Sequence, residues 1–267
     1  MSIKIAIHGA GGRMGRSLVR VVHETPSAEL VGAVDHGETV GKDAGALAGL
    51  EPLGVEITAD VSAAIARADV VIDFTLPHAT AALLPLVEAS AARLVIGTTG
   101  ITDETNAAIR ALASARGIVY APNYSQGVTA LFYLAERAAE LMGPAFDAEI
   151  FEMHHRLKVD APSGTAVKLL DVVARAKGAD PKRDALFGRE GQVGARTDAE
   201  IGVMTLRGGD VVGEHTLFLS GVGERLELTH RATDRMIFAR GAVRAALFAA
   251  TAGPGLFDMF DVMGISR

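Results

Sequence analysis

Strand-like and helix-like segments alternate along the first half of the chain, and this alternation limits the fold more than any other feature. Short apolar runs rich in β-branched residues are separated by longer stretches with helical spacing. Such an alternation predicts an α/β fold, with a parallel sheet built from right-handed crossovers. The expected strands are Ile3–Ile7, Leu30–Val34, Val70–Phe74, Leu94–Ile96 and Ile118–Tyr120, and the expected helices are Arg13–His23, His78–Ala89 and Asp103–Ala115, the last with Thr102 as a cap.

The second half of the chain has a different pattern, in which strand signals follow one another. Gly208-Gly209 is typical of a two-residue hairpin turn, and Gly221 to Gly223 indicates another reversal. We therefore expect a second, α+β domain with a mostly antiparallel or mixed sheet. Its expected elements are strands Ala148–Met153, Ile201–Arg207, Val211–Ser220 and Arg225–Arg231, helix Thr165–Lys177 and a long loop over 178–197, followed by a last helix over Asp234–Ala250.

Composition excludes several classes of function. The chain has no cysteine, which removes disulfides, thiolate nucleophiles and thiolate metal sites and fits a reducing cytosol. The net charge of −6 argues against a nucleic-acid partner, which needs a broad cationic face. The longest nearly apolar stretch, Ala245–Phe257, is too short to span a bilayer. We expect a soluble, cytoplasmic protein.

A glycine-rich loop, Gly9 to Gly15, lies between the first expected strand and the first expected helix. Glycines let a dinucleotide pyrophosphate approach the backbone, and the helix N-terminus offers N–H groups with a partial positive charge. The spacing departs from the strict Gly-x-Gly-x-x-Gly pattern, and turns that bind no ligand share it. The loop therefore needs a second signal.

Asp35, at the end of the second expected strand, supplies that signal. A carboxylate there can accept hydrogen bonds from the adenosine ribose hydroxyls and would repel a 2′-phosphate. The nearby Arg13, Arg16 and His36 could still accommodate such a phosphate. The sequence predicts a site for NADH or NADPH without choosing between them.

Residues 154–158 form a basic cluster of two histidines, an arginine and a lysine directly after an expected strand. Cations grouped this closely repel one another unless an anion binds nearby. Downstream, Ser163-Gly164-Thr165 opens an expected helix, whose N–H groups and Thr165 hydroxyl could hold a carboxylate. A histidine is the usual general acid near neutral pH. An exposed charged turn would give the same pattern, whereas a zinc site would lack a third ligand at the usual spacing.

Two further loops follow expected parallel strands: Gly97 to Gly100 (GTTG) and Ala121 to Ser125 (APNYS). Loops in this position line the ligand crevice of open α/β sheets, although either could be only a turn.

These motifs closely resemble those of the bacterial dihydrodipicolinate reductase (4-hydroxy-tetrahydrodipicolinate reductase) family of the diaminopimelate and lysine pathway. The resemblance covers essentially the whole chain, and its most specific segment is HHRLKVDAPSGT. Two positions depart from the pattern of some members: His36 stands where they have an arginine, and Leu157 where they have a histidine. The shared segments, in order, are GAGGRMGR, IDFT, GTTG, APNYS, HHRLKVDAPSGT, VGEHT, GERLELTHRA and GLFDM.

The resemblance implies a homotetramer whose subunit has a Rossmann-like dinucleotide-binding domain over 1–125 plus 235–267. A substrate-binding and oligomerisation domain would be inserted over 126–234. It also implies that His154 and Lys158 are catalytic proton carriers, with no metal ion. His155, Gly164 and Thr165 would bind substrate carboxylates. The residues implied to surround NADH or NADPH are Gly9, Ala10, Gly11, Gly12, Arg13, Met14, Asp35, His36, Gly97, Thr98, Thr99, Ala121, Pro122, Asn123 and Tyr124.

The activity implied is the NAD(P)H-dependent reduction of 4-hydroxy-tetrahydrodipicolinate (dihydrodipicolinate) to tetrahydrodipicolinate. Two other functions fit parts of the sequence. A relative of aspartate or homoserine dehydrogenase would share the architecture, but it does not account for the basic cluster followed by the helix start at Ser163. A non-catalytic dinucleotide sensor would use Gly9 to Asp35 and would have no need of a histidine–lysine cluster.

Overall fold

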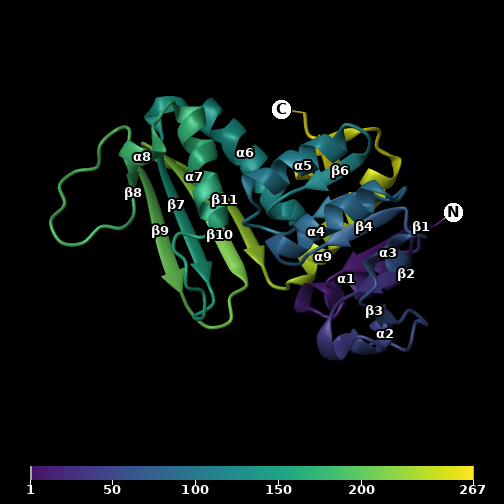
Figure 1. Ribbon diagram of the computed structural model, residues 1–267. Coiled ribbons are helices and arrows are strands. Elements are labelled where there is room, and N and C mark those ends of the chain that lie inside the picture. The colour runs from purple at the N-terminus through teal and green to yellow at the C-terminus, as the bar shows by residue number, and fades with distance from the viewer. Residues whose placement is uncertain (1, 267) are drawn as a thin grey trace. The chain divides into compact units, whose positions relative to one another are not determined.

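The computed structural model describes residues 2–266. The chain divides into two compact units, each with its own sheet (Figure 1). The first unit is made of the residues up to Gln126 and those from Met236 onward, and the second unit is Gly127–Arg235.

The first unit contains a seven-stranded sheet in which every pairing is parallel, in the order β12-β6-β5-β4-β1-β2-β3. The parallel sheet predicted from the first half of the sequence is confirmed. The sequence had not indicated the short strands at either edge, β3 and β12. The strands are β1 Ile3–His8, β2 Ala28–Val34, β3 Ile57–Thr58, β4 Val70–Asp73, β5 Arg93–Ile96, β6 Gly117–Tyr120 and β12 Gly255–Phe257.

Helices cover both faces of this sheet, because successive side chains of a strand point to opposite faces. On one face, Ile5, Ile7 and Ile72 pack in a core with residues of α1 and α9. On the other, Ala6 and Val71 pack with residues of α3, α4 and α5. The helices are α1 Arg13–Glu24, α2 Ala44–Leu47, α3 Val61–Ile65, α4 Pro77–Glu88, α5 Asp103–Ala113, α9 Met236–Thr251 and α10 Met259–Val262, with a 3₁₀ turn η1 at Gly37–Thr39.

The second unit contains a five-stranded mixed sheet in the order β11-β10-β7-β9-β8. α7 packs against β7 and β9, and an ion pair of 2.9 Å between Arg175 and Glu136 joins α7 to α6. The elements are α6 Gln126–Met142, η2 Gly143–Ala145, β7 Asp147–His154, α7 Gly164–Lys177, α8 Pro181–Asp184, β8 Ala185–Leu186, β9 Ile201–Arg207, β10 Gly213–Gly221 and β11 Glu224–Ala232.

The hairpin predicted at Gly208-Gly209 is wrong. β7 lies between β9 and β10, parallel to the first and antiparallel to the second. The two glycines form backbone hydrogen bonds with the end of β7 and the loop after it. Gly208 N–H donates to His154 O, and Gly209 O accepts from Arg156 N–H. The sheet is therefore mixed. The reversal predicted at Gly221 to Gly223 is confirmed, because β10 and β11 pair as antiparallel neighbours.

Two helices of the second unit illustrate what local sequence does and does not indicate. α7 begins where the Ser163-Gly164-Thr165 motif predicted, with the Ser163 side chain accepting a hydrogen bond from Ala166 N–H. It ends at Gly178, whose φ of +67° is the left-handed conformation that favours glycine at a helix end. α6 was not predicted, although Val128, Leu131, Phe132, Ala135 and Ala139 form a buried stripe at helical spacing.

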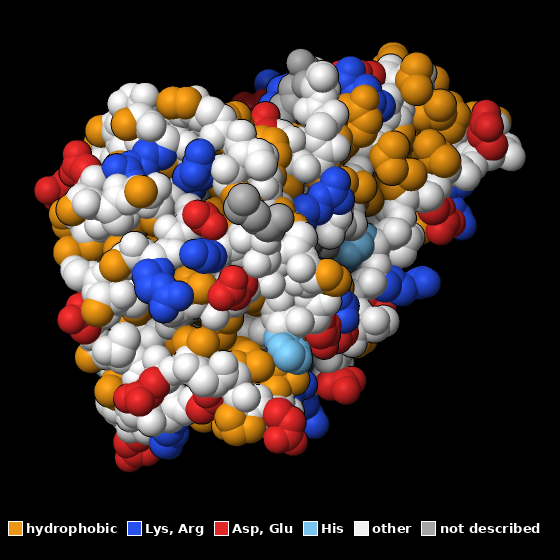
Figure 2. Space-filling view, turned by 90° about the vertical axis from the view of Figure 1, so that its right-hand side faces the viewer, with side chains coloured by type: hydrophobic (Ala, Val, Ile, Leu, Met, Phe, Trp, Pro, Cys, Tyr) orange, Lys and Arg blue, Asp and Glu red, His pale blue; other side chains and the backbone are white. Residues whose placement is uncertain are grey.

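The surface carries charges of both signs. On the face in Figure 2, Lys and Arg side chains are interspersed with Asp and Glu, as the small net charge leads one to expect. Among residues 2–266, no helix combines the length and the apolar character needed to cross a bilayer.

Candidate active site

The residues expected to surround a dinucleotide lie in four loops of the first unit, after β1, β2, β5 and β6. The carboxyl ends of parallel strands lie along one edge of a sheet, so these loops share an edge. A pocket of about 410 Å³ opens there, and its lining includes Gly9, Gly12, Asp35 and His36. Within the described residues, the lining comes from the last residues of β1 and β2 and from the segments that follow β1, β2, β3 and β4.

The glycine loop fits a dinucleotide pyrophosphate. A Cβ at Gly15 would lie 2.1 Å from Gly9 O, so no larger residue can occupy position 15 without moving the loop. Gly12 is the N-cap of α1 and supplies no capping side chain, which leaves the first N–H groups of the helix for a phosphate. Asp35 braces the loop, because its Oδ2 accepts from Gly11 N–H at 2.7 Å.

Asp73, at the end of β4, joins three of the strand ends. Its carboxylate is fully buried and lies 2.9 Å from His8 Nδ1, 2.6 Å from Thr75 Oγ1 and 3.2 Å from Thr98 Oγ1. Thr80 Oγ1 donates to it as well. Sequence reasoning gave this residue no role, because its partners come from four separate segments.

Tyr124 lies in the core rather than at the surface of the site. The residue is 1% exposed, its ring packs 5.3 Å from the ring of Phe74, and its hydroxyl lies 2.8 Å from Ile96 O. Tyr124 as a whole therefore offers a ligand almost no surface, and its carbonyl oxygen lies against Gly241.

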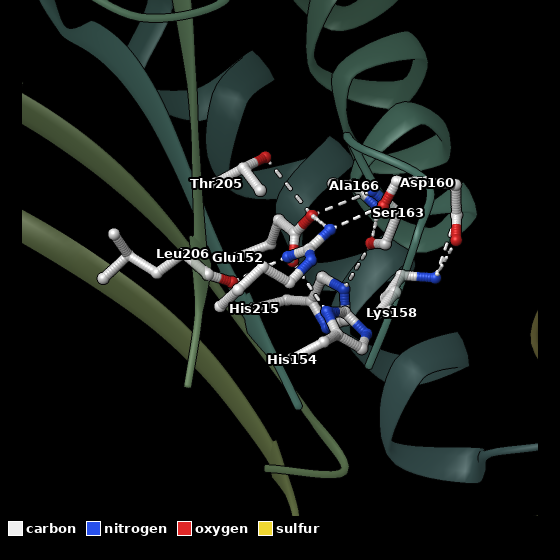
Figure 3. Close-up of polar contacts among 10 residues, drawn as sticks. Glu152, His154, Lys158, Asp160, Ser163, Ala166, Thr205, Leu206 and His215 are labelled. Carbon is white, nitrogen blue, oxygen red and sulfur yellow. Dashed lines mark hydrogen bonds and ion pairs between the residues drawn. The ribbon is translucent and has the colours of Figure 1, made fainter. Parts of the chain in front are cut away.

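The basic cluster lies at the end of β7 in the second unit, next to the start of α7 (Figure 3). His154 Nδ1 lies 2.6 Å from Glu152 Oε2. The Lys158 ammonium donates to both carboxylate oxygens of Asp160, at 2.8 and 2.9 Å. Gly164 and Thr165 are the first two residues of α7, so the expected carboxylate-binding helix start and the histidine belong to one region of the fold.

Glu152 connects these elements. Its carboxylate is 0% exposed and accepts from the Arg207 guanidinium at 2.9 and 3.1 Å, from Ser163 N–H at 2.9 Å and from Thr205 Oγ1 at 3.3 Å. Burial by itself raises the pKa of a carboxyl group. Here the hydrogen bonds from Arg207, His154 and Ser163 outweigh burial, and the pKa of Glu152 is lowered. Glu152 is therefore ionised at neutral pH.

His154 has a lowered pKa. Burial is the largest cause, and the positive charges of Lys158 and Arg207 act in the same direction. The hydrogen bond and the negative charge of Glu152 raise the pKa of His154 but do not compensate fully. The free protein therefore holds a neutral His154 at pH 7, and a negative charge placed beside the ring would favour its protonation.

His215, on β10, stands edge-on to His154, with the ring centroids 5.1 Å apart and the planes at 74°. Its Nε2 lies 3.0 Å from Ser163 Oγ, while its Nδ1 has no hydrogen-bond partner within residues 2–266. Burial, together with the positive charge that His154 carries once it is protonated at low pH, lowers the pKa of His215 to about 3. His215 therefore stays neutral across the physiological range.

Sequence reasoning proposed roles for His154 and Lys158, and it gave none to the residues that contact them or lie beside them: Glu152, Asp160, Arg207 and His215. For Glu152 a signal existed, since residues i and i+2 of a strand share a face. No local pattern connects Glu152 to Arg207, which is 55 positions away. Of the other expected substrate residues, His155 has an Nδ1 that is buried and unpaired within the described part of the chain. No group of three His, Cys, Asp or Glu among residues 2–266 is arranged to hold a metal ion.

Comparison with known proteins adds independent information. The family model "Dihydrodipicolinate reductase, N-terminus" matches residues 3–124, and "Dihydrodipicolinate reductase, C-terminus" matches residues 127–263. The 4-hydroxy-tetrahydrodipicolinate reductase of Alkalilimnicola ehrlichii is 52% identical over 267 residues, covering 99% of this chain and 100% of the relative. The reductase of the same name from Anaeromyxobacter sp. is 51% identical over 263 residues, covering 98% of each.

Two solved structures are also similar. The dipicolinate-bound dihydrodipicolinate reductase from Paenisporosarcina sp. TG-14 aligns with a TM-score of 0.80 and 29% identity, covering 98% of this chain and 99% of that one. The myo-inositol dehydrogenase of Lactobacillus casei aligns with a TM-score of 0.60 at 15% identity, covering 98% and 91%, which shows a shared fold alone. With family models over both units and relatives of about half identical sequence along its full length, the chain belongs to the dihydrodipicolinate reductase family.

Proposed function

We propose that the chain reduces 4-hydroxy-tetrahydrodipicolinate (dihydrodipicolinate) to tetrahydrodipicolinate with NADH or NADPH, a step of lysine and diaminopimelate biosynthesis. Full-length relatives named for this reaction support the proposal. The single observation from the site that supports it most is the His154–Glu152 pair beside the cationic loop and the start of α7. A nucleotide sensor would have no use for such a pair.

The first unit is proposed to bind the dinucleotide. The uncapped start of α1 and the glycine loop would hold the pyrophosphate, and Asp35 would accept from the ribose hydroxyls. The site would extend along the sheet edge to Gly97, Thr98, Thr99 and the Ala121–Tyr124 loop. When bound, the reduced nicotinamide supplies a hydride.

The second unit is proposed to bind the dicarboxylate. N–H groups of Gly164 and Thr165 at the start of α7 attract one carboxylate through the helix dipole. The ammonium of Lys158 and the imidazole of His155 would contact the rest of the dianion. Asp160 orients Lys158 in the free protein, and a dianion would compete with Asp160 for that ammonium.

His154 is proposed to carry the proton. Reduction of a conjugated imine requires a proton as well as a hydride, and the negative charge of the substrate would raise the lowered pKa of His154. Binding of substrate would thereby convert His154 into an acid at the place where the proton is needed, with Lys158 as a second donor.

The subunit organisation and location remain predictions. The expected homotetramer can be tested by analytical ultracentrifugation of the purified chain. A cytoplasmic location is supported by the cysteine-free sequence.

The direct test is an assay of NADH and NADPH oxidation with substrate generated enzymatically from its aldehyde and keto-acid precursors. Oxidation that depends on the imine dicarboxylate is expected, with no oxidation of NADH or NADPH by aspartate semialdehyde and no reduction of NAD⁺ or NADP⁺ by homoserine. Turnover of either of those two compounds, or binding of the nucleotide without any turnover, would overturn the proposal.

A further inference from the structure

Glu152 and His154 lie on the same face of β7, two residues apart, and their side chains meet inside the unit (Figure 3). The oxygen–nitrogen distance of 2.6 Å is short even for a charge-assisted hydrogen bond. An ionised carboxylate can only accept hydrogen bonds. Because Glu152 is ionised, the hydrogen between them must sit on His154 Nδ1.

This fixes the form of the neutral imidazole. With the hydrogen on Nδ1, Nε2 carries the lone pair, so a proton enters and leaves the ring at Nε2. Gly213, on β10, flanks that atom: a Cβ at Gly213 would lie 2.9 Å from Nε2. The absence of a side chain at Gly213 thus keeps this nitrogen uncovered on that side.

The position of the carboxylate is itself fixed from three directions. Arg207 of β9, Thr205 of the same strand and the Ser163 N–H ahead of α7 all donate to it. Glu152 cannot rotate away from His154 without leaving several buried donors unpaired. The other charged groups that act on His154 are Lys158 and Arg207, and both disfavour a positive charge on the ring. His215 packs edge-on against the ring as a neutral imidazole. Of these groups, only Glu152 favours protonation of His154.

We propose that Glu152 is a positioning residue of the reduction: it holds His154 as the Nδ1–H tautomer, presents Nε2 for proton transfer, and stabilises the imidazolium. The inference rests on the proposed function, because it gives His154 the role of proton donor. The Glu152 carboxylate is in turn held by its hydrogen-bond donors Arg207, Thr205 and Ser163, which position His154 through Glu152.

The experiment starts with the unaltered protein. Long-range ¹H–¹⁵N correlation spectra of histidine-labelled protein report the tautomer of each imidazole, and a His154→Gln spectrum assigns the signal of His154. The Nδ1–H form is expected at pH 7.5 in the free protein. The Nε2–H form would overturn the proposal without any variant being made.

Glu152→Gln is the second arm. A neutral amide can offer either its oxygen or its NH₂ group to Nδ1, so we expect mixed tautomers and a lower His154 pKa. Turnover is expected to fall at least about 100-fold, as for a displaced general acid, with the KM for substrate changed less than about threefold. Unchanged tautomer and turnover would overturn the proposal. Loss of turnover with the tautomer and pKa retained would do the same, since that is the mark of a merely structural role.

Glu149→Gln is the matched control, because it makes the same chemical change on the same strand. Glu149 pairs with Arg189 and Arg196 and has no contact with His154. Its variant is expected to keep the His154 spectrum and the turnover. The tautomer arm needs no substrate, so a chain that fails to reduce the imine dicarboxylate but shows the Nδ1–H form would refute the proposed function and leave the Glu152–His154 relationship intact.

Discussion

Gly213 leaves the space that the His154 ring occupies: a Cβ at this position would come within 2.9 Å of Nε2 and 3.3 Å of Cδ2. The added methyl group of Gly213→Ala should therefore displace the His154 ring and strain its hydrogen bond to Glu152. We expect turnover to fall at least about tenfold, equivalent to about 1.4 kcal/mol of transition-state stabilisation. Steady-state kinetics measure this. Gly253→Ala, where a Cβ meets no atom within 4 Å, should change nothing; equal rates for both variants would contradict the account.

His154→Gln and Lys158→Ala should lower turnover by about two to four orders of magnitude, the usual effect of losing a positioned acid. The dissociation constant of NADH, measured by fluorescence titration, should stay within twofold because its proposed site lies in the other unit. Lys168→Ala, which removes an exposed lysine from α7, is the control for the loss of charge. Normal turnover in both site variants would show that their assigned roles are wrong.

The stability of the protein should decrease as the pH falls from 7 to 5. His215 has a folded-state pKa of about 3, well below its ordinary value of 6.5, because burial disfavours the charged ring. The unfolded chain therefore binds a proton that the folded chain does not, and stability is lost as the pH falls below 6.5. The contribution of His215 between pH 7 and pH 5 is about 2 kcal/mol. The lowered pKa values of His154 and His230 act in the same direction.

Urea unfolding of the unaltered protein and of His215→Asn at both pH values isolates this contribution. The variant should lose less stability between pH 7 and pH 5, although it starts from a lower value. Parallel pH dependences in the two proteins would mean that His215 is protonated in the folded state.

Asp73→Ala should destabilise the first unit by about 3 kcal/mol, because three buried partners and one partly buried donor lose their acceptor. These are His8, Thr75, Thr80 and Thr98. Affinity for NADH should fall as well, since the carboxylate ties together the ends of β1, β4 and β5. Urea unfolding and nucleotide titration test both effects, with the exposed Asp198→Ala as the reference. Unaltered stability would mean that the donors find other partners.

Asp35→Asn should shift the nucleotide preference toward NADPH. The amide keeps an acceptor for Gly11 N–H but removes the negative charge that repels a 2′-phosphate. We expect the ratio of kcat/KM for NADPH over NADH to rise about tenfold, or 1.4 kcal/mol. Asp103→Asn, an exposed residue of α5, should leave the ratio unchanged. A constant ratio in Asp35→Asn would place the ribose away from this carboxylate.

The sequence was sufficient to predict those structural elements that depend on residues close to one another in the chain. The glycine loop before α1, the Thr102 cap of α5 and the start of α7 at Ser163-Gly164-Thr165 are each contained within a few positions, and each was predicted from the sequence. The strand alternation of the first half was sufficient for the same reason, because each crossover unit is continuous in the chain.

The remainder depends on contacts between distant segments. Gly208-Gly209 has the composition of a hairpin turn, yet each residue of β9 pairs with a residue of β7 that lies 53 positions earlier, and only the complete sheet decides this. The partners of Glu152 come from positions 163, 205 and 207. A buried glutamate in a strand is a sign that such partners exist, but it does not identify them. α6 was missed although its apolar spacing was available.

β7 has a hydrogen-bonded strand on either side, whereas the sheet of the second unit ends at β11 and β8. Local opening of a sheet begins at its edge strands, because these are hydrogen-bonded to a neighbouring strand on one side only. The amide protons of residues 150–154 should therefore exchange with deuterated solvent among the slowest in this unit. The Glu152 carboxylate and the His154 imidazole would therefore remain paired during local fluctuations of the sheet. They would separate only when the whole unit unfolds.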